Sequence, residues 1–330
     1  MSDHTKRLAK FAGRILVTTG LLVWVFRQVD IEQFKQAIRS AQWQYVVAAW
    51  VFTAGFFLIQ SVAMQMILKK QSCEVSIVTL FGASAVTSLY SMVLPGILST
   101  GAKWYILKRS TGKGTNVLSS MVYNQCALFV TMISIGLTAT IVANPLVVLS
   151  EKSGTHIFAS VVSAALLMLV ILGCVLLLNI RTGGWGMRLV RSMLRILPGR
   201  IQVRAEEITD QITVFQTAGA GFHLKIAVVT LAAGLLVCGP AYASAARAAA
   251  IDVPVGLLVW LCASVYVLGR LPVSIANLGV RESVLVGLLS MYGVEKSTAL
   301  LMSIILFSAL VFMALIGVGY QIAWSLRRPD

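Results

Sequence analysis

The sequence has few charged residues. Charged side chains make up 12% of its 330 residues and apolar side chains 58%, whereas an average soluble domain has roughly 25% and 45–50%. So few charges cannot cover a water-exposed surface, and so many apolar residues exclude a disordered chain. We therefore expect an all-α integral membrane protein that forms a single polytopic membrane domain, residues 1–330.

Cysteine and histidine are scarce and scattered. The five cysteines include no Cys-x-x-Cys pair, and the three histidines, His4, His156 and His223, are far apart. No His-Glu-x-x-His, Gly-x-Ser-x-Gly or phosphate-binding glycine loop occurs. We therefore expect no disulfide framework, no metal site, no cofactor and no enzymatic activity.

Long apolar runs are what the sequence does contain. A spanning helix needs about 20 mostly apolar residues. Six segments meet or approach this requirement: 11–29, 43–66, 117–143, 156–179, 224–246 and 298–325. Interfacial aromatics support two of these boundaries, because Trp43 opens the second segment and Trp324 closes the last. The first segment follows a basic stretch without a cleavage site, so we interpret it as an uncleaved signal anchor.

Two further apolar stretches, residues 75–107 and 254–291, are interrupted by proline and polar residues. Proline removes a helical donor and clashes with the preceding turn. Broken backbone inside a bilayer is tolerated where it is buried in protein or lines a cavity. We interpret each stretch as a re-entrant helical hairpin, and an arrangement of eight transmembrane helices is the alternative.

The distribution of basic residues favours the hairpins. With both stretches re-entrant, most of the 27 Lys and Arg residues lie on the side of the amino terminus. Full crossing of residues 75–100 would move the basic loops that follow to the opposite side and remove this bias. The positive-inside rule then predicts cytoplasmic amino and carboxyl termini. The hairpins would enter from opposite sides, as in an inverted repeat.

The longest polar segment, residues 180–223, is strongly basic. Arg188, Arg191 and Arg195 recur at helical spacing, which is typical of an amphipathic helix on an anionic membrane surface. The alternative is that these basic residues only keep the segment on the cytoplasmic side of the membrane, as the positive-inside rule describes. In either case the basic excess indicates lipids with anionic headgroups as partners, and no nucleic acid.

Polar residues at membrane depth mark candidate functional positions, because burying them is costly. They gather at the two breaks. The candidate substrate-binding residues are Pro95, Gly96, Ser99, Thr100 and Lys103 in the first stretch, and Arg270, Pro272, Ser274, Asn277, Gly279, Arg281 and Glu282 in the second. Their net positive charge, with free backbone donors at helix starts, favours an anionic group such as a phosphate.

We expect Arg281 and Glu282 to be the functional centre. Adjacent helical residues point about 100° apart, so each should find a different partner. Glu282 would pair with Arg270 or Lys103 across the break. Arg281 would then bind a phosphate in bidentate fashion, through two N–H groups of its guanidinium. The alternative is that Arg270 and Lys103 extend to the membrane surface while Arg281 pairs with a nearby carboxylate.

These residues carry a resemblance to a known family. The runs Leu271-Pro272-Val273-Ser274, Leu278-Gly279-Val280-Arg281-Glu282, Leu94-Pro95-Gly96 and Lys103-Trp104-Tyr105-Ile106-Leu107 resemble signatures of the lysylphosphatidylglycerol synthase transmembrane-region family, also called flippase-like. The resemblance covers about residues 10–325. It implies the translocase-like membrane part alone, because 330 residues leave no room for the aminoacyl-transferase domain of the full synthase.

The chain also departs from the family pattern. Ser99-Thr100 and Lys103 stand where the family often has Gly-Asp and Arg, and Asn124-Gln125 stand where it often has Glu-Arg. These departures imply a substrate other than a lysyl-lipid. We therefore expect a translocase of an anionic lipid or a polyprenyl-linked envelope glycan intermediate. The alternative is a non-transporting partner or regulator of an envelope-assembly enzyme, acting through residues 180–223.

Overall fold

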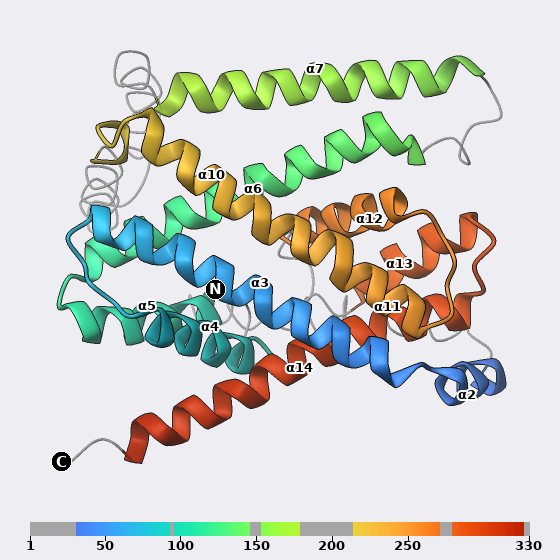
Figure 1. The fold of residues 1–330 in the computed structure, drawn as a ribbon, viewed down its shortest axis with the longest axis horizontal. Helices are drawn as coiled ribbons and strands as arrows, with labels where there is room; N and C mark the ends of the chain where they lie inside the picture. Colours follow the sequence, from blue (N-terminus) through green and yellow to red (C-terminus); the bar gives the residue numbers. More distant parts are fainter. Residues whose placement is uncertain (1–30, 93–95, 146–152, 179–213, 271–278, 327–330) are drawn as a thin grey trace, which may run out of the picture.

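The computed structural model describes residues 31–92, 96–145, 153–178, 214–270 and 279–326. The regular elements in these ranges are all helices (Figure 1). An all-α membrane protein is thus confirmed.

Five helical segments are long and apolar enough to cross a membrane. They are α3 (Trp43–Lys70), α6 (Gly114–Ala143), α7 (Ser153–Leu178), the continuous run of α10 (Ala220–Leu236), η2 (Val237–Ala241) and α11 (Tyr242–Ala248), and α14 (Lys296–Leu326). They confirm five of the six predicted spans. The sixth, residues 11–29, lies outside the described residues, and the short helix α2 (Ile31–Ser40) precedes α3.

The span built from α10 and α11 is less regular than its sequence suggested. Pro240 lies inside η2, one turn of π-helix in the middle of the span. Proline lacks the N–H that an α-helix needs and clashes with the preceding turn, and a π-bulge accommodates this without ending the helix.

The two interrupted stretches are each divided into two short helices. The first contains α4 (Ile77–Ser91) and α5 (Gly96–Thr111), and the second contains α12 (Val255–Leu268) and α13 (Val280–Met291). Each helix is shorter than the roughly 20 residues that a full crossing needs. Helices α4 and α12 thus end before the predicted breaks, whose residues 93–95 and 271–278 lie outside the described residues.

The first stretch returns to the end of the molecule from which it starts. Lys113, which follows α5, donates from Nζ to the carbonyl oxygen of Ser72, which precedes α4, at 3.1 Å. Gln71 Nε2 likewise donates to Ser119 Oγ, in the first turns of α6, at 3.4 Å. Because both ends of the stretch meet beside the start of α6, α4 and α5 form a hairpin, as predicted.

The second stretch forms a hairpin at the other end of α6. Gly256, at the start of α12, packs against Ala143, at the end of α6. The hydroxyl of Tyr292, directly after α13, donates to the carbonyl oxygen of Pro145. The two hairpins therefore enter from opposite ends of the molecule (Figure 1), which is the arrangement that the inverted-repeat interpretation requires.

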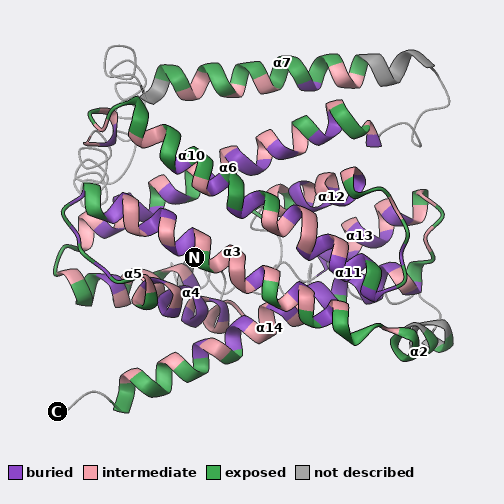
Figure 2. Ribbon diagram, in the orientation of Figure 1, coloured by how far each residue is buried: buried purple, intermediate pink, exposed green. Residues whose placement is uncertain are grey.

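Helix α14 packs against both hairpins. Gly317 packs against the backbone of Ala85 in α4, and Ser303 contacts α13 through Arg281. Helix α7 lies at the periphery beside α6, and exposed residues follow most of its length (Figure 2). Its exposed apolar surface suits lipid, whereas α14 is largely buried in its first half.

Candidate functional site

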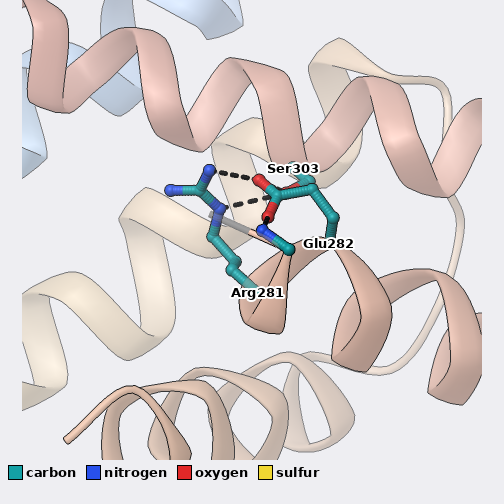
Figure 3. A network of polar contacts seen from close by, with 4 residues as sticks. Arg281, Glu282 and Ser303 are labelled. Atoms are coloured by element: carbon teal, nitrogen blue, oxygen red, sulfur yellow. Dashed lines mark hydrogen bonds and ion pairs between the residues drawn. The ribbon is translucent and has the colours of Figure 1, made fainter. Parts of the chain in front are cut away.

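Arg281, Glu282 and Ser303 form a buried polar network between α13 and α14 (Figure 3). Arg281 and Glu282 are only 5% and 4% exposed. Arg281 donates from Nε to Ser303 Oγ at 3.0 Å, and Ser303 donates to Glu282 Oε1 at 3.1 Å. A direct ion pair joins Arg281 Nη2 to the same carboxylate oxygen.

The start of α13 explains how this network is built. Gly279, directly before the helix, has a φ of 85°, in the left-handed region that favours glycine. Its N–H donates to Glu282 Oε2 at 2.7 Å. Glu282 thereby satisfies one of the free donors at the helix start, where a negative charge is also favoured.

This geometry corrects the expectation for the pair. We expected adjacent residues on a helix to find separate partners, but Arg281 and Glu282 bind each other. The carboxylate turns back toward the Gly279 N–H, and this brings it within reach of the long Arg281 side chain. The prediction that Glu282 holds Arg270 or Lys103 is wrong, and the alternative of a nearby carboxylate for Arg281 is right.

Arg281 therefore does not present both of its terminal nitrogens to a ligand. Nη2 and Nε bind Glu282 and Ser303, while Nη1 makes no hydrogen bond within the described residues and points away from Glu282 (Figure 3). The guanidinium carbon lies 5.2 Å from the centre of the Phe307 ring. The Nη1 amino group, with its two N–H bonds, remains for an anion, whereas the Phe307 ring covers one face of the guanidinium.

The other two candidate cations have neutral partners. Arg270 is exposed at the end of α12, where it donates to the Tyr266 hydroxyl and lies 4.5 Å from the centre of that ring. Lys103 is half-buried in α5 and donates from Nζ to Ser84 Oγ in α4 at 2.9 Å. No carboxylate within the described residues contacts the Lys103 ammonium.

Lys103 and Arg281 lie beside different parts of α14. Lys103 contacts Ser84, whose neighbour Ala85 packs against Gly317 of α14, whereas Arg281 contacts Ser303 of the same helix. Ser303 and Gly317 are about 20 Å apart along the axis, from a rise of about 1.5 Å per residue. The candidate residues thus form two cationic positions along α14 instead of one cluster.

The remaining candidates are partly described. Ser99 is buried, Thr100 is half-buried, and both make contacts within the structure. Gly96 is the first residue of α5. Pro95, Pro272, Ser274 and Asn277 lie outside the described residues, as does most of the basic segment 180–223.

The sequence alone did not identify the partners Ser303 and Ser84. Each is a serine inside an apolar helix, and only this polarity could have pointed to them. Asn124 of α6 donates to Gln60 Oε1 of α3 at 3.4 Å, so this departure from the family pattern bonds a neighbouring helix. Within the ranges described above, no group of three His, Cys, Asp or Glu residues could hold a metal ion.

The fold defines a class: a multi-pass, all-α membrane protein with two opposed hairpins of short helices. The family model of the lysylphosphatidylglycerol synthase TM region matches residues 11–319. The chain therefore belongs to this family, which associates it with lipid and envelope biology and confirms the resemblance found in the sequence. A search of the curated proteins found no match.

Proposed function

We propose that this protein is a translocase that moves an anionic lipid, or a polyprenyl-linked envelope glycan intermediate, across a bacterial inner membrane, and that it is not an enzyme. Both termini would be cytoplasmic, and no cofactor would be required. Anionic headgroups would be its ligands, and envelope-assembly enzymes its partners.

The Lys103 ammonium is the observation that carries this proposal. It lies in the first hairpin with only the neutral Ser84 hydroxyl as a partner within the described residues. A cation at membrane depth is costly unless a negative charge compensates it. A phosphate from a lipid headgroup would supply this charge during passage.

The second cationic position supports a path along α14. Arg281 is already neutralised by Glu282, so its remaining Nη1 amino group would attract an anion less strongly than the Lys103 ammonium does. A headgroup that leaves Lys103 would thus meet a weaker site about 20 Å further on by the helical rise. Weak and separated sites permit release as well as binding.

Reconstitution into liposomes tests the proposal. The full chain is incorporated with fluorescent anionic phospholipids, a zwitterionic phospholipid and a polyprenyl-phosphate sugar, and the loss of outer-leaflet signal after chemical quenching is followed over time. We expect faster transbilayer movement of at least one anionic probe. If none is accelerated over empty liposomes, the proposal is wrong.

Variants of two lysines in the same helix make the test specific. Lys103→Gln should lower the transport rate about tenfold or more, which corresponds to one lost charge-assisted contact of roughly 1.5–3 kcal/mol. Lys108→Gln is the control, because Lys108 is exposed and lies over the Trp104 ring, 4.9 Å from its centre. Equal rates for both variants would contradict the assigned role of Lys103.

The alternative of a non-transporting partner depends on residues 180–223. Residues 179–213 lie outside the described structure, so this alternative stays a prediction.

A further inference from the structure

A polar pocket lies at the end of the molecule that also holds the second hairpin. Its volume is about 300 Å³, and its lining residues are Gln42, Tyr45, Arg247, Ala250, Ile251 and Asp252. They come from the start of α3, the end of α11 and the loop that follows α11. None of them belongs to the candidate residues described above.

The backbone fixes the shape of this pocket. The Ile251 N–H donates to the Ala246 carbonyl at 2.8 Å, and the Ala250 N–H donates to the Arg247 carbonyl at 3.0 Å. These two bonds form a Schellman-type helix end. Ala250 occupies the position with a φ of 56°, where glycine is usual. The Gln42 N–H donates to the Ala248 carbonyl at 3.1 Å and so attaches α3 to this turn.

Two opposite charges line the pocket without pairing with each other. Arg247 and Asp252 make no ion pair within the described residues. The Arg247 guanidinium instead lies over the Tyr45 ring, 5.9 Å from its centre. The pocket is thus lined by a cationic and an anionic residue that are not paired with each other, together with Gln42.

The pocket lies at the level expected for lipid headgroups. It includes the first turn of α3, where Trp43 is 68% exposed. Exposed tryptophan at the end of an apolar helix is typical of the membrane–water interface. A ligand here would most readily come from the lipid leaflet at this end.

We propose that this pocket binds the zwitterionic phosphoethanolamine headgroup of a phospholipid. Arg247 would bind the phosphate with two N–H groups, and Asp252 would bind the primary ammonium. A purely anionic headgroup would be opposed by Asp252, and a simple cation by Arg247, so the two charges together select a ligand that carries both. This binding does not depend on translocation.

Lipid binding to the purified full chain in detergent tests the proposal. The probes are phosphatidylethanolamine and phosphatidylglycerol with identical acyl chains, and soluble glycerophosphoethanolamine as competitor. We expect phosphatidylethanolamine to bind about tenfold more tightly than phosphatidylglycerol, the effect of one charge-assisted contact. Competition would show that the headgroup alone suffices, and absence of competition would show that the lipid is required. Equal binding of the two lipids would overturn the proposal.

Two variants separate the roles of the charges. Asp252→Asn should abolish the preference for phosphatidylethanolamine, and Arg247→Gln should weaken binding of both lipids. Arg39→Gln and Glu295→Gln are the matched controls, because these exposed residues lie at the same end outside the pocket. Asp252 is exposed, so its variant should fold normally, and melting temperatures verify this. An unchanged preference in folded Asp252→Asn would also overturn the proposal.

Discussion

At the scale of single residues, the pairing of Arg281 with Glu282 changes what the centre of the second hairpin does. A buried ion pair contributes little net stability, because desolvation offsets the attraction, but breaking it leaves an uncompensated charge. The network includes the Gly279 N–H and Ser303 Oγ, so it fixes the start of α13 against α14. We infer that its first role is positional.

Glu282→Gln should therefore lower the stability strongly. The amide oxygen can still accept from the Gly279 N–H, but Arg281 loses its counterion in a buried site. We expect a loss of about 3–5 kcal/mol in the free energy of unfolding, measured as a lower melting temperature and denaturant midpoint in detergent.

A comparison within the network checks this explanation. Ser303→Ala should cost less, about 1–3 kcal/mol, because it leaves one donor unpaired. The double variant Arg281→Gln/Glu282→Gln should lose less than the two single variants together. Ser325→Ala, on the exposed end of α14, should have no effect. Strict additivity would mean that the charges act independently.

Sequence reasoning could identify these residues but not their contacts. Arg281 and Glu282 were recognisable because charges inside an apolar stretch are costly. Their mutual bond was not, because it depends on a carboxylate that turns back to the helix start and on a serine of α14. Lys103 was likewise recognisable, whereas its partner Ser84 depends on how α5 folds back onto α4.

At the scale of elements, the two breaks were predictable because they follow from local chemistry. Proline and clustered polar residues end a helix whatever surrounds it. The π-helical turn at Pro240 was not predicted. A proline can end a helix or be accommodated in a π-bulge, and the packing around it decides between the two. The close approach of α4 and α14 could not be predicted from the sequence either.

This close approach leads to a prediction for Gly317. A Cβ at this position would lie 2.4 Å from the Ala85 carbonyl oxygen and 2.6 Å from its carbon, and backbone cannot move aside locally. Gly317→Ala should force α14 away from α4 and cost about 1–3 kcal/mol, measured by thermal unfolding in detergent.

Two other glycines provide graded controls. The three atoms nearest to a Cβ at Gly82 all belong to the Tyr320 side chain, which can shift more readily than backbone, and a Cβ at Gly319 would meet nothing within 4 Å. Gly82→Ala should therefore have an intermediate effect, and Gly319→Ala should be neutral or slightly stabilising because alanine favours a helix. If all three variants behave alike, the close contact does not determine how the helices pack.

At the scale of the whole molecule, the opposed hairpins follow from the distribution of charge. Hydropathy alone permits eight crossings, and only the requirement that basic loops share one side favours two re-entrant stretches. The contact between Lys113 and Ser72 agrees with this requirement. The separation of the two cationic positions along α14 did not follow from the sequence, because it is set by which residues of α14 each hairpin contacts.

Cysteine labelling in a background without native cysteines tests this topology. Glu74→Cys and Thr115→Cys flank the first hairpin and should react with a membrane-impermeant maleimide from the same side, which we expect to be the cytoplasm, as for Gly183→Cys. Glu295→Cys follows the second hairpin and, with Gly154→Cys at the start of α7, should react from the opposite side. Labelling of positions 74 and 115 from opposite sides would mean that the first stretch crosses the membrane. The opposed hairpins, and the path along α14 that depends on them, would then both be wrong.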